Sequence, residues 1–426
     1  AEFNAAEWGL SDPFINLAAG HHKPETPMQW IITEADRLAS GIDREKYEER
    51  NHMADVAKFR VTRMLCPFEE IELPETEDKR KKFKSADDFK WRLPLREVSA
   101  CALFPVLRAE AENETSATKE YGDLFFKFVA ALEKLEHQDS LALWYEHFDS
   151  LYGIYAGLIP AATVDVLADV SLYDHSRAVA AFSAASYQYH QAKGTMTIDA
   201  IRDKEEKKYQ LILGDFFGIQ NFIFSEGGQT RRNAAKLLRG RSFYVSLLTE
   251  LAADFLLREL GLPVTSLLIN AAGKFAILAP NLEQVKTAIA RVRKQVNDWV
   301  VKHFMGQASL GIVCIEAAPC DFENGRWSDL WNQASRALSA VKSRRIDLEA
   351  YGGVQHGFIE QFGEFGLCPF CGQRPGDSWV RVGVDNDKVA CCGICADQME
   401  MGRSLVRKET RYLAITEIDA DLRKEG

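Results

Sequence analysis

The 426-residue chain lacks any apolar run near the roughly 18 residues that a membrane-spanning helix requires. It also lacks the pattern of a secretory signal, so we expect a soluble protein with no membrane partner. Its odd number of clustered cysteines indicates a reducing compartment, so we expect the cytoplasm. Its net charge of −10, from 52 basic and 62 acidic residues, excludes a uniformly basic nucleic-acid clamp. Any contact with nucleic acid must therefore come from a local patch or be shared with a partner.

The composition is otherwise that of a folded protein, with 46% hydrophobic and 27% charged residues. At about 150 residues per domain, the length predicts two to four domains. Apolar residues spaced three and four apart predict a mostly helical first part, and a charged hinge follows at 203–208. Further helices are expected at 123–135, 141–155, 282–304 and 327–343, a loop at 74–90 and a last strand at 411–418.

After the charged hinge the order of elements is strand, helix, strand, tight turn at 271–274, strand, helix and strand. This order is typical of a ferredoxin-like α/β sandwich. We therefore predict a multidomain protein of the α and α+β classes. Its parts would be a helical domain over 1–202, a ferredoxin-like domain over 203–345, and a cysteine-rich module with the following segment over 346–426.

Nine cysteines are present, an odd number, and five of them crowd into 368–395. Cys368 and Cys371 form one C-x-x-C pair, and 20 residues separate it from the second pair, Cys392 and Cys395. Two such turns can direct four thiolates at one ion, which predicts a tetrahedral zinc site. Four thiolates leave no open coordination position, so the zinc would be structural. Cys391 is a spare that could replace Cys392.

A second candidate metal site combines the adjacent His21 and His22 with Asp36. Thr26 and Pro27 predict the start of a helix that would carry Asp36 at the edge of its apolar face. Imidazoles and a carboxylate suit Mn, Fe, Co or Ni, which could activate water for phosphodiester hydrolysis. The alternative is that the paired histidines are only surface or capping residues.

His175 follows Asp174 and shares an apolar helical face with Val179 and Phe182. On the residues alone, a histidine in this position is either a core residue with satisfied hydrogen bonds or a functional ligand.

Asp215 lies where a strand is followed by a helix, and strand ends are common places for ligand-binding carboxylates. The densest group of positive residues in the chain follows it, between 231 and 241. These cations could contact the phosphates of nucleotide or RNA, or could form a solvated helix face. The tight turn at 271–274 lacks the paired acids that a ferredoxin-like nucleotide cyclase needs. The cations of the patch are Arg231, Arg232, Lys236, Arg239 and Arg241.

Together these segments resemble, in order, the large subunit of type III CRISPR effector complexes, particularly subtype III-A. The resemblance runs from residue 20 to 395. It is carried by GHHKPETPMQWIITEADRLASG, DVSLYDHSRAVAAF, ILGDFFGIQNFIF, LRGRSFYVSLLTELAADFLL, INAAGKFAILAP and CPFCG with CGIC.

The resemblance implies an N-terminal HD-type nuclease domain that cuts single-stranded DNA, followed by two palm (cyclase-like) domains with a zinc module between them. In that family the second palm carries GGDD and makes cyclic oligoadenylates from ATP with Mg, and target RNA turns both activities on. The implied partners are guide RNA, target RNA, the subunit that binds the guide 5′ handle and the small helical subunit.

By the same resemblance, His21, His22, Asp36 and His175 would be ligands of a nuclease metal such as Mn, Ni or Co. The 203–345 region would be the first, degenerate palm. It would supply one wall of an ATP pocket through Asp215, Gln220 and the 231–241 patch.

Two departures limit these implications, because neither a His-Asp dipeptide nor GGDD occurs in the chain. We therefore expect roughly the N-terminal half of a family member, without oligoadenylate synthesis of its own. One alternative is a non-catalytic assembly subunit that docks guide RNA and neighbouring subunits. Another is a free-standing HD phosphohydrolase of small nucleotides, against which the appended palm and zinc module argue.

Overall fold

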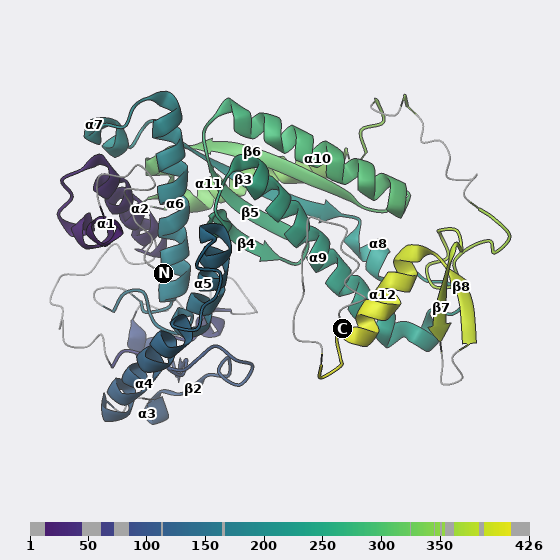
Figure 1. Cartoon of the computed structure of the whole chain (residues 1–426), viewed down its shortest axis with the longest axis horizontal. Helices are drawn as coiled ribbons and strands as arrows, with labels where there is room; N and C mark the ends of the chain where they lie inside the picture. The colour runs from purple at the N-terminus through teal and green to yellow at the C-terminus, as the bar shows by residue number, and fades with distance from the viewer. Residues whose placement is uncertain are drawn as a thin grey trace, which may run out of the picture.

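The computed structural model has helices at one end, a β-sheet in the middle and a small cysteine-rich part at the other end (Figure 1). The described residues are 13–44, 61–71, 85–111, 114–163, 167–323, 325–344, 346–349, 352–353, 362–382 and 387–409. The strand expected at 411–418 and most of the loop expected at 74–90 lie outside them. No helix within these ranges is long and apolar enough to cross a membrane.

The central sheet has four strands in the order β4-β5-β3-β6, and each neighbouring pair is antiparallel. Its strands are β3 (Tyr209–Phe217), β4 (Leu267–Ala271), β5 (Lys274–Pro280) and β6 (Ser309–Ala317). The helices between them are α8 (Ile219–Ile223), α9 (Ala234–Leu260) and α10 (Glu283–Phe304). This strand order and the strand directions confirm the predicted ferredoxin-like topology.

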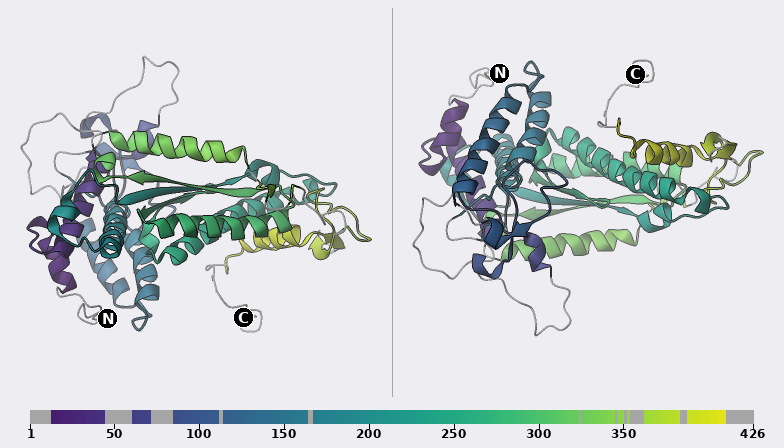
Figure 2. Two further views of the ribbon diagram at one scale, coloured as in Figure 1. Left: turned by 90° about the horizontal axis from the view of Figure 1, so that it is seen from above. Right: turned by 90° about the horizontal axis from the view of Figure 1, so that it is seen from below.

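Both faces of the sheet are buried at β3, which explains why this strand reads as a nearly continuous apolar run. Successive side chains point to opposite faces, so Leu211 lies in one core and Ile212 in the other. The Ile212 core is covered by α9 and α10, whereas α11 (Arg326–Lys342) lies on the Leu211 face (Figure 2).

Two helices from the N-terminal part, α2 (Pro27–Arg44) and α6 (Leu172–Lys193), also cover the Leu211 face. Phe182 of α6 lies edge-to-face against Tyr209 and Phe322, with ring centroids 5.4 and 4.9 Å away. The N-terminal helices and the sheet therefore share one core.

The charged segment at 203–208 is tightly bonded, contrary to the hinge expected there. The fully buried Lys208 donates from Nζ to the carbonyls of Ala200 and Ile201, at the end of α7 (Ile198–Arg202). The Asp203 carboxylate accepts from the backbone N–H of Glu205 at 2.8 Å. These bonds fix the path from α7 into β3.

A helical hairpin is attached to this core through Arg177 of α6. Its guanidinium donates to Asp149 and to the carbonyls of Val264 and Leu267, just before and at the start of β4. The hairpin consists of α4 (Glu114–Leu132) and α5 (Leu141–Ala156).

Other small elements are α1 (Phe14–Ala19), β1 (Trp91–Arg92), β2 (Val106–Leu107), α3 (Arg108–Ala111) and the 3₁₀ turns η2 (Gly20–His22), η4 (Pro67–Glu70), η6 (Ala86–Asp88), η7 (Arg231–Asn233), η8 (Val264–Ser266) and η9 (Pro319–Phe322).

The cysteine-rich part packs its helix directly against α9. It contains a hairpin of β7 (Ser378–Val382) and β8 (Asp387–Cys391), then α12 (Gly393–Ser404). Its buried Phe370 and Met399 belong to the same core as Ile212. Glycines allow the close approach, because a Cβ at Gly240 would lie 1.9 Å from the carbonyl oxygen of Gln398.

We predict that Gly240→Ala destabilises the protein by about 1–3 kcal/mol, because the new methyl group must displace α12 from α9. Gly122→Ala in α4 is the matched control, since a Cβ there meets nothing within 4 Å and alanine favours the helix. Thermal unfolding should show a lower Tm for Gly240→Ala alone. Equal Tm values for the two variants would contradict the close packing.

Candidate functional site

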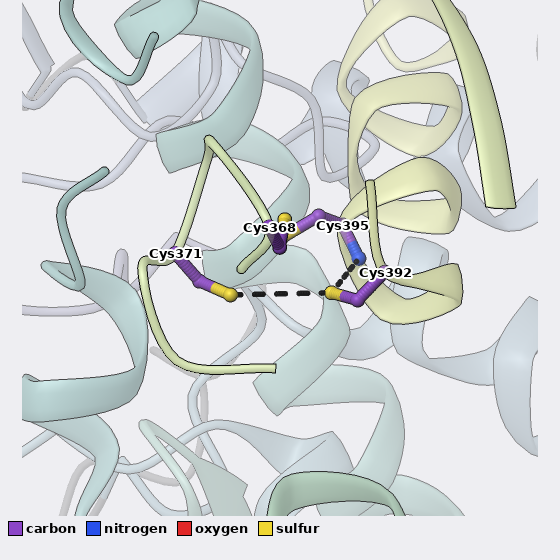
Figure 3. Close-up of side chains that lie close together, drawn as sticks. All are labelled: Cys368, Cys371, Cys392 and Cys395. Carbon is purple, nitrogen blue, oxygen red and sulfur yellow. Dashed lines mark hydrogen bonds between the residues drawn. The ribbon is translucent and has the colours of Figure 1, made fainter. Parts of the chain in front are cut away.

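The four cysteines of the two C-x-x-C pairs form one buried cluster (Figure 3). All four Sγ atoms lie within 4.8 Å of one another, and Cys371 Sγ lies 4.0 Å from Cys392 Sγ. A tetrahedral zinc with Zn–S bonds of about 2.3 Å separates its sulfurs by about 3.8 Å. The donor set therefore fits a structural zinc ion, and Cys391 is not a member of the group.

Local backbone bonds shape each half of the cluster. In the first half, Gly372 with φ of +66° donates its N–H to the carbonyl of Cys368, which closes the turn between the two cysteines. In the second half, Cys392 is the N-cap of α12, and its Sγ accepts from the N–H of Cys395 at 3.4 Å.

Two of the five cations in the positive patch contact this cysteine-rich part. The buried Arg241 donates to the carbonyls of Ile223, Ser225 and Phe370 at 2.7–3.0 Å. Arg239 donates to the carbonyl of Gly402. The interpretation of Arg241 as a phosphate-binding cation is therefore wrong, because protein carbonyls occupy its buried guanidinium.

The other three members of the patch differ in exposure. Arg231 and Arg232 are exposed in η7, and Lys236 is half-buried in the first turn of α9. These three positions can still present positive charge to a ligand.

Between the two inner strands of the sheet, where β5 begins, Asp215 of β3 pairs with Lys274 of β5. Lys274 Nζ donates to Asp215 Oδ2 at 2.9 Å, and the carboxylate is mostly buried. Gln220 is exposed on the short helix α8 that follows. The one acidic side chain predicted for this site is thus already neutralised by a cation.

Asp36 and His175, which are 139 residues apart in sequence, meet where α2 packs on α6. His175 Nε2 lies 3.1 Å from Asp36 Oδ1. This hydrogen bond is the largest influence on Asp36, and it holds the pKa of the carboxyl below its usual 3.8 against the opposing effect of burial.

The adjacent histidines lie in η2, directly before α2. The His21 carbonyl accepts from Thr33 Oγ1 at 2.6 Å, which joins the turn to the helix, and His21 Nδ1 contacts the carbonyl of Ala18. Their charges lower the pKa of Asp36 further, as smaller contributions. The turn therefore lies beside the Asp36–His175 pair.

These four side chains alone do not fit a complete metal site. Within the part of the chain that the structure describes, the four cysteines are the only group of three or more potential ligands that converge. The assignment of His21, His22, Asp36 and His175 as one ligand set stays a prediction.

Sequence reasoning missed Arg374, a buried arginine beside the sulfurs. Its Nε lies 3.2 Å from Cys392 Sγ and its Nη2 lies 3.6 Å from Cys395 Sγ. Its place within the sequence between the two cysteine pairs was the only available signal.

Comparisons with known proteins agree with one another. The family described as "Csm1 subunit domain B" matches residues 208–353. A "CRISPR system single-strand-specific deoxyribonuclease Cas10/Csm1 (subtype III-A)" from Methanocaldococcus jannaschii is 27% identical over 80% of this chain and 44% of its own length. The protein of the same description from Enterococcus italicus is 31% identical over 66% of this chain and 37% of its own length.

Among solved structures, a Csm1-Csm4 subcomplex of the type III-A CRISPR-Csm interference complex aligns with a TM-score of 0.58 and 21% identity. That alignment covers 84% of this chain and 41% of the solved chain. A Csm1-Csm4 cassette in complex with cA4 gives a TM-score of 0.54 at 21% identity, over 78% and 38% of the two chains. The chain thus spans less than half the length of the relatives it matches.

We predict that the purified protein carries about one zinc ion per chain. Cys371→Ser should lose the metal and lower the Tm, because zinc binding contributes folding free energy. Cys391→Ser is the matched control, since this buried thiol lies outside the cluster, and it should keep the zinc. Elemental analysis measures the metal, and equal zinc content in both variants would contradict the assignment of ligands.

We also predict that Asp36 and His175 are coupled by about 0.5–1 kcal/mol at pH 7, a value reduced by their partial exposure. A double-mutant cycle with Asp36→Asn and His175→Gln measures this coupling from urea unfolding. Because the folded pKa of Asp36 is depressed, the stabilisation is present above pH 3.8 and is lost as the pH falls through the folded pKa.

The control for this cycle is Asp298→Asn, which removes an exposed ion pair on α10 and should change stability by less than about 0.5 kcal/mol. Zero coupling between Asp36 and His175 at pH 7 would refute the hydrogen bond.

Proposed function

We propose that this chain belongs to the large subunit of an RNA-guided antiviral effector complex. The premise is its homology to part of the Cas10/Csm1 proteins of subtype III-A CRISPR systems. Its parts would be an HD-like nuclease unit over 1–202, a first palm over 203–345 and a zinc module from 346. The matching of residues 208–353 to the Csm1 domain supports this assignment for the palm.

The nuclease role depends on the pair formed by Asp36 and His175. The observation that carries it is the 3.1 Å contact that joins two sequence motifs 139 residues apart, with His21 and His22 in the adjacent turn. Relatives described as single-strand-specific deoxyribonucleases support DNA as the substrate. We propose that these residues supply part of the site of a divalent metal such as Mn, Ni or Co, which needs further ligands.

For the palm we propose nucleotide binding without catalysis. The pairing of Asp215 with Lys274 supports this, because a cation already neutralises this carboxylate, and the turn at 271–274 lacks the paired acids of a cyclase. We propose that Asp215, Gln220 and the cations Arg231, Arg232 and Lys236 form one wall of a pocket for ATP with Mg.

The proposed partners are the other subunits of the complex, guide RNA and target RNA, and the proposed compartment is the cytoplasm. Solved Csm1-Csm4 complexes of this fold support a subunit partner. All nine cysteines lie within the described residues, and none forms a disulfide, as is usual in a reducing compartment.

A second candidate function is a non-catalytic assembly subunit. It is favoured by the use of Arg239 and Arg241 as structural links to the cysteine-rich part, and by the incomplete metal site. In this case the helical unit would only dock guide RNA and neighbouring subunits.

We predict that the chain cleaves end-labelled single-stranded DNA when Mn²⁺ or Ni²⁺ is added. The variants His175→Ala and His21→Ala/His22→Ala should lose at least about tenfold of the rate, because each removes a proposed ligand. His147→Ala on the exposed face of α5 is the matched control and should cleave normally.

Two outcomes would overturn the nuclease proposal for this chain. Cleavage that survives loss of His175 would place the activity elsewhere. A wild-type protein that carries its zinc but does not cut would favour the assembly role. Preference for small nucleotides over DNA would instead support a free-standing phosphohydrolase.

A further inference from the structure

We infer that Arg374 is a positioning residue for the metal centre. It donates hydrogen bonds to two zinc-bound thiolates and connects them to the sheet domain. The inference concerns the four-cysteine cluster and does not depend on the proposed nuclease activity. It assigns a role to a residue that is neither a ligand nor part of either C-x-x-C motif.

The contacts of Arg374 span both halves of the cluster. Its Nε and Nη2 approach Cys392 Sγ and Cys395 Sγ at 3.2 and 3.6 Å. Its backbone carbonyl accepts from the N–H of Cys368 at 2.8 Å, in the first half. One residue therefore fixes the spacing between the two cysteine pairs, and it is only 2% exposed.

Charge explains why an arginine is suitable in this buried position. Four thiolates around Zn²⁺ carry a net charge of −2, and a buried charge without a partner is costly. The planar guanidinium of Arg374 is permanently charged and presents several N–H groups in a fork, so it can serve two sulfurs together. A lysine would bring the charge without this geometry.

The same guanidinium reaches into the sheet domain. Arg374 Nη1 donates to Gln307 Oε1 at 3.0 Å, and the group lies over the Phe222 ring at 5.7 Å. Gln307 in turn lies against the end of β3, because a Cβ at Gly218 would be 2.0 Å from its carbonyl oxygen. The sulfurs, Arg374, Gln307 and the β3–α8 turn thus form a continuous chain of contacts.

The test is the rate at which zinc passes from the purified chain to a chromophoric chelator. Arg374→Met should release zinc about 10–100-fold faster than the wild type, as is typical when a partner of metal ligands is lost. Arg374→Lys should give an intermediate rate, because it keeps the charge and loses the fork. Arg381→Met is the matched control on the exposed side of β7 and should release zinc at the wild-type rate.

Two further measurements keep the inference testable if Arg374→Met does not fold. Gln307→Ala leaves all cysteines and Arg374 in place but removes the anchor of the guanidinium, so zinc release should accelerate several-fold. In cobalt-loaded protein, Arg374→Lys should shift the thiolate-to-cobalt charge-transfer band, because hydrogen bonding changes the donor strength of sulfur.

Zinc release within twofold of the wild type in both Arg374→Lys and Gln307→Ala, with an unchanged cobalt spectrum, would overturn the inference. Arg374 would then only fill space beside the cluster.

Discussion

The burial of the sheet on both faces is the constraint on which the rest of the structure depends. A strand such as β3, with Leu211 on one side and Ile212 on the other, is stable only when helices cover both faces. The helices α9 and α10 cover one face, and they come from within the sheet domain itself. The other face needs α2, α6 and α11, so the N-terminal helices are part of the domain that they precede.

This constraint also places the candidate site. Asp36 lies on α2 and His175 lies on α6, and their contact follows from the packing of both helices on the Leu211 face. At the other end, the cysteine cluster sits against the Ile212 core. The two candidate metal-related sites therefore lie on opposite faces and at opposite ends of one packed unit. Packing on the Leu211 face holds one of them, and the Ile212 core holds the other.

Periodic and motif-bearing parts of this structure could be predicted from the sequence. The ferredoxin-like topology followed from the order of the strands and helices along the chain and from the turn at 271–274, and the cysteine cluster followed from spacing. Burial between distant segments could not be predicted in this way. Arg241 reads as a surface cation because nothing near it in sequence shows that Phe370 will cover it. The pairing of Asp36 with His175 is likewise a tertiary contact, which only a family resemblance could suggest.

The shared core on the Leu211 face has a consequence for the order of folding during synthesis. Phe182 leaves the ribosome about 150 residues before Leu330, with which it shares a core, and synthesis at 5–20 residues per second makes this interval roughly 7–30 s. During that time β3, β4 and β5 emerge in turn, but the Leu211 face still lacks β6 and α11. We expect the nascent N-terminal helices to depend on chaperones, or on transient contacts with one another, until β6 and α11 have emerged.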